Sequence, residues 1–401
     1  MIKITESGIK KVNDLKIKLS IVVPTKNRHF YLEFIVNYFK SINSNEIELI
    51  IYDNSSIKLR QNFISFLSTI KDERIKYFQD DKEMSQTENC DLAVSKASGE
   101  YISLLGDDDI FSKHILTYIE QWSEDQIEAI LPVKGTYIWP DVKPRLYGNK
   151  QSGMFKLGLF SNKVVMIESE KILAKVLNTG GSDILNLPRV YHGIVSKKIL
   201  NKIFEDCGSY FPGPSPDIAN AVAICKYVKN YIIIDTPLII SGQCIKSAGG
   251  QGAEGKHYGE ISKINQLPKN TAKEWSKKIP FYWSGLTIYA ESVSKALEKM
   301  KMNEYFKKLN YEYLYASCLV FDSNYINKIK KCVKENMSLF RRIKIFYYFL
   351  AIWFRRLFFH FRNNLVLFIP KILRPKLESS FKQNILEVAI TNDKIIESKI
   401  L

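Results

Sequence analysis

Short apolar runs alternate with longer segments of helical periodicity through the first third of the chain. The runs are continuous and rich in β-branched residues, which is typical of strands buried on both faces of a sheet. The intervening segments place apolar side chains three and four residues apart, which predicts amphipathic helices. We expect strands at residues 19–25, 47–53, 74–78, 101–105 and 127–132, and helices at residues 30–39, 59–70, 85–98 and 111–122. This alternation predicts an α/β fold with right-handed βαβ units and a mostly parallel sheet flanked by helices.

The pattern is less regular beyond residue 132. We expect strands at residues 190–195 and 231–240 with a helix at residues 218–227 between them. Residues 249–255 contain four glycines and predict a flexible loop. From residue 269 onward the chain is helical in pattern, aromatic and rich in lysine. We therefore predict a first domain over residues 1–262 and a helical C-terminal region over residues 263–401.

The charge balance points to a polyanionic partner. The formal net charge is +16, which suits nucleic acid, an anionic membrane surface or phosphorylated substrates. The six cysteines are scattered and form no C-x-x-C pair, which indicates reduced thiols and a cytoplasmic location. The N-terminal segment has no long apolar run, so we expect no secretory signal peptide there.

Residues 337–376 form a basic and aromatic segment. Nine Lys and Arg residues lie between Glu335 and Glu378, and no acidic residue does. The apolar run at residues 345–354 is too short to span a bilayer and stops at two arginines. This composition favours association with the anionic inner face of the cell membrane. The alternative is a helical pair docked on the first domain, with arginines that extend to solvent.

Three consecutive carboxylates, Asp107, Asp108 and Asp109, follow the apolar run at residues 101–105. Adjacent negative charges repel, but a hard divalent cation such as Mg²⁺ or Mn²⁺ takes oxygen ligands and would favour such a cluster. In an open α/β sheet, ligands bind beyond the carboxyl ends of the strands, where this triplet falls. The alternative is an acidic helix start, with Asp107 or Asp108 as the N-cap.

Three strand ends together carry a family resemblance. The first strand runs into PTKNR at residues 24–28, the second into DNSS at residues 53–56, and the acidic triplet follows GEYI at residues 99–102. As a set these motifs resemble family 2 glycosyltransferases of GT-A fold over about residues 18–135. The resemblance implies a nucleotide-binding half at about residues 18–132 and an acceptor-binding half at about residues 133–262.

The resemblance also implies roles for individual residues. Those expected to bind the nucleotide-sugar are Pro24, Thr25, Asn27, Arg28, Asp53, Asn54, Ser55, Asp107 and Asp108, and those expected to hold the metal ion are Asp107, Asp108, Asp109 and His257. Asp53 has a second interpretation as a turn-forming residue, Arg28 as a surface ion pair, and His257 as a solvated loop residue. The chain has Gly106 where the family commonly has Asp, and it lacks an Arg often found in the helix before the triplet. Diphosphate contacts from Lys26 or Arg28 would compensate for that loss.

Sugar transfer with inversion needs a general base that takes the proton of the acceptor hydroxyl. Asp217 follows Ser215-Pro216 at the place where many relatives carry this base, although the position also suits an N-cap.

These observations predict an inverting, metal-dependent glycosyltransferase of bacterial surface polysaccharide synthesis, located in the cytoplasm and peripheral on the membrane. The expected partners are a UDP-sugar donor, a glycan or polyprenyl-diphosphate-linked acceptor, a divalent cation (Mn²⁺ or Mg²⁺) and an anionic membrane, but no nucleic acid. A nucleotidyltransferase is the rival enzyme, but its glycine-rich phosphate loop is missing after the first strand. A non-enzymatic basic protein that binds membrane or nucleic acid would explain the charge but leaves the acidic triplet unexplained.

Overall fold

Strands β1 (Leu19–Thr25) and β2 (Ile47–Asp53) form the centre of the fold, with the bounds expected from the sequence. The computed structural model describes residues 16–123, 126–144, 151–255, 258–368 and 378–400. β1 pairs in parallel with β2 and with β4 (Tyr101–Leu104), and β2 pairs in parallel with β3 (Ile75–Gln79). Parallel strands point their carboxyl ends to one edge, so the loops after β1, β2 and β4 meet there.

Alternate residues of β1 face two separate hydrophobic cores, because successive side chains of a strand point to opposite faces. Ile21 and Val23 belong to the core that includes α1 (His29–Lys40), whereas Val22 belongs to the core that includes α3 (Gln86–Ser95). Helix α3 begins with a capping box, since Ser85 Oγ accepts from the amide of Glu88 and Glu88 Oε2 accepts from that of Ser85.

The second half of the sheet is mixed. β9 (Ile194–Ser196) lies antiparallel between β4 and β6 (Ala129–Ile138), and β6 pairs in parallel with β10 (Asn230–Gln243). The remaining strands of this half are β5 (Ile110–Phe111), β7 (Met154–Leu157) and β8 (Val164–Glu168). Its helices, with those of the first half, are α2 (Ile57–Ser68), α4 (Ile115–Ser123), α5 (Ser169–Asn178), α6 (Lys197–Cys207), α7 (Pro216–Ile224) and α8 (Ala248–Ala253). The predicted α/β class is confirmed.

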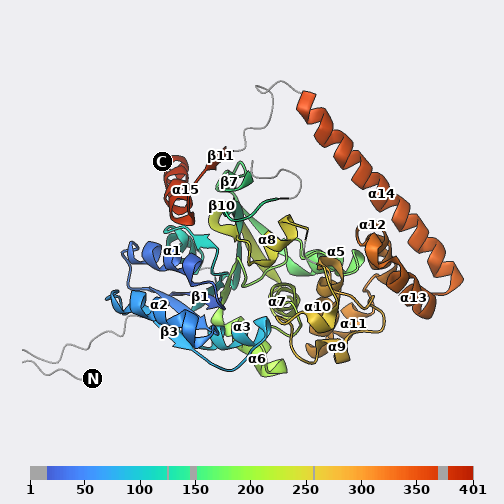
Figure 1. The fold of residues 1–401 in the computed structure, drawn as a ribbon, viewed down its shortest axis with the longest axis horizontal. Coiled ribbons are helices and arrows are strands. Elements are labelled where there is room, and N and C mark those ends of the chain that lie inside the picture. Colours follow the sequence, from blue (N-terminus) through green and yellow to red (C-terminus); the bar gives the residue numbers. More distant parts are fainter. Residues whose placement is uncertain (1–15, 124–125, 145–150, 256–257, 369–377, 401) are drawn as a thin grey trace, which may run out of the picture.

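The C-terminal region is helical through residue 368 and then returns to the sheet. Its helices are α9 (Thr271–Glu274), α10 (Gly285–Lys299), α11 (Asn303–Phe306), α12 (Tyr311–Phe321), α13 (Ile326–Asn336) and α14 (Leu339–Phe368), with short 3₁₀ turns at Ile261–Lys263 and Ser323–Tyr325. α14 is the long diagonal helix of Figure 1, and it packs on α12. Within the described residues, no helix combines the length and apolar character that crossing a bilayer requires.

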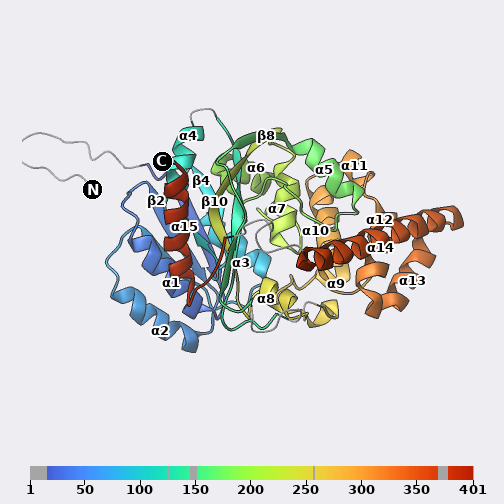
Figure 2. The ribbon, with the colours of Figure 1, turned by 90° about the horizontal axis from the view of Figure 1, so that it is seen from above.

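The last two elements of the predicted C-terminal region, residues 263–401, join the sheet of the first domain. β11 (Glu378–Phe381) pairs antiparallel with β7, and α15 (Ile385–Ile400) packs against α1 and β10 (Figure 2). Tyr38 and Ser112 both donate to Asp393 of α15, at 2.5 and 2.6 Å. The C-terminus is therefore part of the first domain's core.

Three local predictions were wrong. The glycine-rich segment at residues 249–255 is largely the short helix α8, because Ser247 Oγ accepts from the amide of Gly250 as an N-cap. The helix expected from residue 111 begins at Ile115, after the short strand β5. The strand expected at residues 190–195 is only β9, because His192 has a φ of 58°, which breaks an extended chain.

A buried carboxyl group in α10 predicts a pH-dependent stability. Glu291 is buried, and its two oxygens accept from the amide of Ser276 at 3.2 and 3.1 Å. Burial raises the pKa of Glu291 to about 7. The folded state therefore holds a proton that the unfolded chain releases, and stability falls as pH rises from about 4.5 to about 7.

At pH 8 we expect Glu291→Gln to be more stable than the wild type by roughly 2–3 kcal/mol in free energy of unfolding, and therefore to unfold at a higher temperature. At pH 4.5 we expect the two proteins to unfold at the same temperature. Thermal melts across this pH range check the expectation. Parallel curves for the two proteins would contradict it.

Candidate active site

The loop after β1 and the acidic triplet after β4 are joined by direct contacts. Thr25 Oγ1 donates to Asp107 Oδ2 at 2.6 Å. Arg28 Nε lies 2.9 Å from Asp107 Oδ1, and one of its terminal nitrogens lies 3.7 Å from Asp108 Oδ1. All three aspartates are almost fully buried. The structure thus brings together Thr25, Arg28, Asp107 and Asp108, as the sequence predicts for the carboxyl ends of adjacent parallel strands.

The pKa values of Asp107 and Asp108 are both raised by their surroundings. Burial raises the pKa of Asp107 to about 7, with Arg28 opposing the shift and Asp108 adding to it. Burial raises the pKa of Asp108 in the same way. For Arg28, burial alone would lower the pKa, but the two carboxylates outweigh it and raise the pKa. Two carboxylates thus share one close cation, which leaves the site short of positive charge.

Asp109 has a different environment. Its Oδ2 accepts from the amide of Gly106 at 2.7 Å and lies 2.6 Å from His192 Nε2, and its Oδ1 accepts from the amide of Gly242 at 2.8 Å. Burial alone would raise the pKa of Asp109, but His192 and the two amides outweigh it and lower the pKa. These contacts connect the loop that carries Asp107, Asp108 and Asp109, here called the acidic loop, to β10 and to the segment before β9.

β10 closes tightly over the acidic loop. An added Cβ on Gly242 would lie only 1.7 Å from the carbonyl oxygen of Asp108, so only glycine allows this approach. The amide of Cys244 donates to Asp108 Oδ2 at 3.0 Å, and Trp139 Nε1 donates to the Asp108 carbonyl at 3.1 Å. The triplet forms a turn held by these partners, so it is not the start of a helix.

The residues after β2 lie beside the β1 loop. Ser55 Oγ accepts from the amide of Asn27 at 2.6 Å, and Asp53 Oδ1 accepts from the amide of Ser55 at 2.8 Å. Asp53 Oδ2 lies 2.6 Å from His29 Nε2 and accepts from Tyr77 at 2.7 Å. Asp53 is fully buried, so a nucleobase would have to share or displace one of these donors.

Asn54 and Pro24, two further residues expected to bind the nucleotide-sugar, contact the backbone of neighbouring segments. Asn54 Nδ2 donates to the carbonyls of Asp80 and Lys82, while its buried Oδ1 has no hydrogen-bond partner within the described chain. Pro24 pairs with Tyr52 in the β1–β2 ladder.

Asp217 lies in the first turn of α7, and the N-cap of that helix is Ser215. The N-cap interpretation of Asp217 is therefore wrong. Its Oδ1 accepts from Ser215 Oγ at 2.6 Å, and its Oδ2 accepts from Tyr289 of α10 at 2.6 Å. The charge of Asp217, together with burial, raises the pKa of Tyr289, which keeps that hydroxyl protonated as a donor. Asp217 itself remains partly open to solvent.

Two cations that no sequence motif indicates lie near these carboxylates: Lys134 interacts with both Asp109 and Asp217, and Arg189 with Asp217. Lys134 Nζ lies 3.2 Å from His192 Nδ1, so His192 links it to Asp109. Burial and Arg189 lower the pKa of Lys134, while Asp109 and Asp217 act in the opposite direction. Lys134 is still accessible to solvent. No local motif marks Lys134 or Arg189, because each comes from a stretch without periodic pattern.

His257 lies outside the described residues, so its place relative to this site stays a prediction. Among the residues that the structure does describe, no three His, Cys, Asp or Glu side chains converge as a ready metal centre.

Residues 20–164 match the model of glycosyl transferase family 2. This match and the helix-flanked α/β sheet confirm the predicted GT-A fold class. The chain is 30% identical over 109 residues, 27% of its length, to the GalNAc(5)-diNAcBac-PP-undecaprenol beta-1,3-glucosyltransferase of Campylobacter jejuni. It is 30% identical over 118 residues, 28% of its length, to the abequosyltransferase RfbV of Salmonella typhimurium. The matches span 35% and 34% of those proteins, about a third of each.

Solved structures give more distant similarities. The S. aureus TarS fragment 1–349 in complex with UDP-GlcNAc has a TM-score of 0.43 and 13% identity, over 91% of this chain and 97% of that one. The mannosyltransferase PcManGT from Pyrobaculum calidifontis, in complex with GDP-Man and Mn²⁺, has a TM-score of 0.42 and 12% identity, over 96% of this chain and 86% of that one.

Proposed function

We propose that this protein transfers a sugar from a nucleoside-diphosphate sugar, with inversion, onto a glycan or a polyprenyl-diphosphate-linked acceptor in bacterial surface polysaccharide synthesis. The main support is the joined pair of loops after β1 and β4, where Thr25 and Arg28 contact two buried carboxylates. The family match and the names of the two curated relatives support the reaction class. UDP is the proposed nucleotide.

Asp107 and Asp108 are suited to a Mn²⁺ or Mg²⁺ ion. Asp107 Oδ1 is buried and lacks a well-aligned hydrogen bond, although Arg28 lies nearby. Mg²⁺ commonly takes one or two protein carboxylates and completes its ligands with substrate phosphates, so a cluster of three protein ligands is not required. The ion would neutralise charge that develops on the departing diphosphate. We assign Asp109 to bracing this loop, because protein donors already engage both of its oxygens.

Asp217 is the proposed general base. Its Oδ2 accepts from Tyr289, which fixes the carboxylate, and its partial exposure leaves room for an acceptor hydroxyl. The carboxylate would take the hydroxyl proton as the oxygen attacks the anomeric carbon. Lys134, between Asp217 and the acidic loop, is placed to offset the charge of a diphosphate, in place of the Arg that the helix before the triplet lacks.

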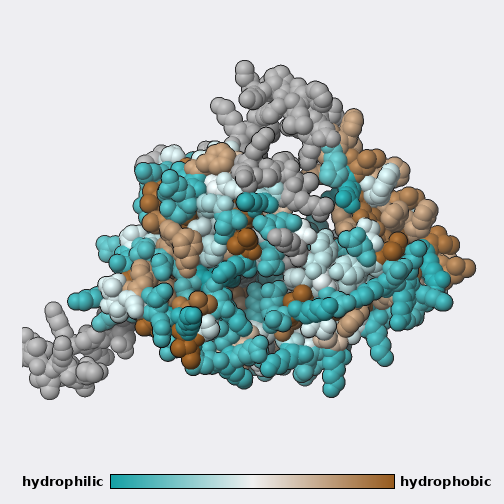
Figure 3. All heavy atoms as spheres, in the orientation of Figure 1, coloured by the Kyte–Doolittle hydropathy of each residue, from teal (hydrophilic) through white to brown (hydrophobic). Residues whose placement is uncertain are grey.

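The helix α14 is the proposed contact with the inner face of the cell membrane. In the described part of the segment at residues 337–376, large apolar side chains are exposed, with Phe340 78%, Tyr347 68% and Phe358 67% accessible. In Figure 3 apolar atoms gather along the edge of the molecule where Figure 1 places α14. A basic helix with exposed aromatic residues suits the interface of an anionic bilayer. A lipid-linked acceptor would then be presented at the same surface.

Calorimetric titration of UDP and of GDP into the whole protein, with and without Mn²⁺, tests the proposed function. We expect one nucleotide to bind about one to one, and at least about tenfold more tightly with Mn²⁺, since an ion held by Asp107 and Asp108 would offset the charge of the diphosphate. Failure of both nucleotides under every metal condition would contradict the proposal. Salt-sensitive binding of duplex DNA would then favour the non-enzymatic alternative.

A further inference from the structure

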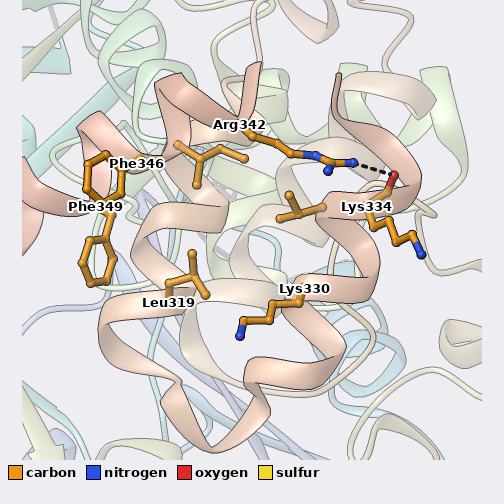
Figure 4. A pocket seen from close by; sticks show the side chains of 8 residues that line it. Leu319, Lys330, Lys334, Arg342, Phe346 and Phe349 are labelled. Atoms are coloured by element: carbon orange, nitrogen blue, oxygen red, sulfur yellow. Dashed lines mark hydrogen bonds between the residues drawn. The ribbon is translucent and has the colours of Figure 1, made fainter. Parts of the chain in front are cut away.

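A groove lies between α12, α13 and α14, away from the acidic loop. It is a cavity of about 460 Å³, within the usual range of about 300–1,000 Å³ for ligand pockets. Five apolar and three cationic residues line it: Leu319, Val333, Ile345, Phe346 and Phe349, with Lys330, Lys334 and Arg342 (Figure 4). Nothing in the proposed sugar transfer uses these residues.

The groove continues along α14. A second hollow of about 320 Å³ shares Leu319 and Phe349 with the first and reaches Trp353 and Leu357. The combined floor is elongated and mostly apolar, with Arg356 and His360 lining the second hollow, which suits an extended hydrocarbon chain better than a compact polar ligand. Residues 353–361, which include part of the lining of the second hollow, are all exposed and contain four phenylalanines, so the groove opens onto a partly apolar surface.

Three of the groove's cations line the first hollow. Arg342 is fixed there because its guanidinium donates to the carbonyls of Met337 and Lys334, at 3.1 and 3.3 Å. In the described chain neither Lys330 nor Lys334 forms an ion pair with a carboxylate, whereas Lys331 on the same helix lies 4.0 Å from Glu335. A mostly apolar channel with three cations around its first hollow is complementary to a molecule with one hydrocarbon tail region and one anionic head.

We propose that this groove holds a single anionic phospholipid from the membrane surface. Its phosphate lies against Lys330, Lys334 and Arg342, and an acyl chain lies along Leu319, Val333 and Phe349. The inference rests on the proposed membrane contact of α14 and adds a defined lipid site to it. A bound lipid would fix α14 against α12 and α13 and so set the height of the active site above the bilayer.

Flotation with phosphatidylcholine vesicles, with or without phosphatidylglycerol, tests the site. The variant Lys330→Gln/Lys334→Gln removes two groove cations, and Lys328→Gln/Lys331→Gln removes two cations of the same helix that do not line the groove. General attraction to an anionic surface would weaken equally in both. We expect the groove variant to bind the phosphatidylglycerol vesicles at least about tenfold more weakly than the matched variant. Equal binding by the two would overturn the proposal.

Three further readouts separate the possible causes of a negative result. Native mass spectrometry of protein purified from membranes should show one copurified phospholipid on the wild type and none on the groove variant. Excess glycerol phosphate should leave vesicle binding unchanged, because it lacks the acyl chain, and displacement by it would overturn the acyl-chain contact. Nucleotide titration of the same variants should match the wild type. A variant that loses the lipid but still binds nucleotide is therefore altered at the groove alone. A failure of the proposed sugar transfer would appear only in the nucleotide titration.

Discussion

Asp108→Asn is expected to reduce sugar transfer by roughly 10³-fold while leaving the fold intact, because one preorganised charge at the departing diphosphate is typically worth about 10²–10³ in rate. The amide keeps the size of the side chain and can still accept from the amide of Cys244. It no longer offers a charged oxygen to an ion. The loss should appear in kcat measured with saturating donor, and in the Mn²⁺-dependent part of nucleotide affinity.

Asp206→Asn is the matched control. Asp206 is a carboxylate of α6 at the surface, where it pairs with Lys226. The same chemical change there should leave transfer and nucleotide binding as in the wild type. Full activity of Asp108→Asn would instead mean that the ion is not held by Asp108.

Asp109→Asn is expected to have the opposite profile, with a large loss of stability. The carboxylate accepts from four donors, Gly106, Gly242, His192 and Tyr191, and an amide nitrogen in its place would face at least one of them. Leaving buried donors unsatisfied costs about 1–3 kcal/mol each, so we expect a loss on the order of 3 kcal/mol. Denaturant unfolding should show this loss, with less than about 1 kcal/mol for Asp108→Asn.

A different result for Asp109→Asn would reassign the residue. If the variant unfolds at the same denaturant concentration as the wild type but loses Mn²⁺-dependent nucleotide binding, then Asp109 is a metal ligand and does not brace the loop. Comparing the Asp108 and Asp109 variants thus distinguishes metal binding from structural support of the loop.

The elements that the sequence predicts well are those with local signals. β1 and β2 have the expected bounds because their apolar runs are continuous and end at Thr25 and Asp53. The capping box at Ser85 and Glu88 is readable because its two partners are three residues apart. Likewise the meeting of Thr25 and Arg28 with the acidic triplet follows from strand order alone.

The parts that the sequence does not predict depend on contacts between distant residues. Gly242 meets the acidic loop from more than a hundred residues away, and no local pattern indicates that its missing side chain matters. His192 was expected in a strand, but its positive φ turns the ring toward Asp109 and Lys134. His29 reaches Asp53 from the start of α1, and Tyr289 reaches Asp217 from the C-terminal region. Such partners become visible only after the chain has folded.

The closure of β10 over the acidic loop limits how this protein can be recombined with its relatives. The family-matched stretch at residues 20–164 ends before β9 and β10, yet Gly242 and Cys244 hold two of the three aspartates. A chimera joined at residue 164 would take the acidic loop from one parent and the residues at positions 242 and 244 from the other. The close contact at Gly242 would then not be preserved by design. A crossover after Cys244 takes the acidic loop, Gly242 and Cys244 from a single parent. Donor specificity should therefore be exchanged between relatives as one block that extends through β10.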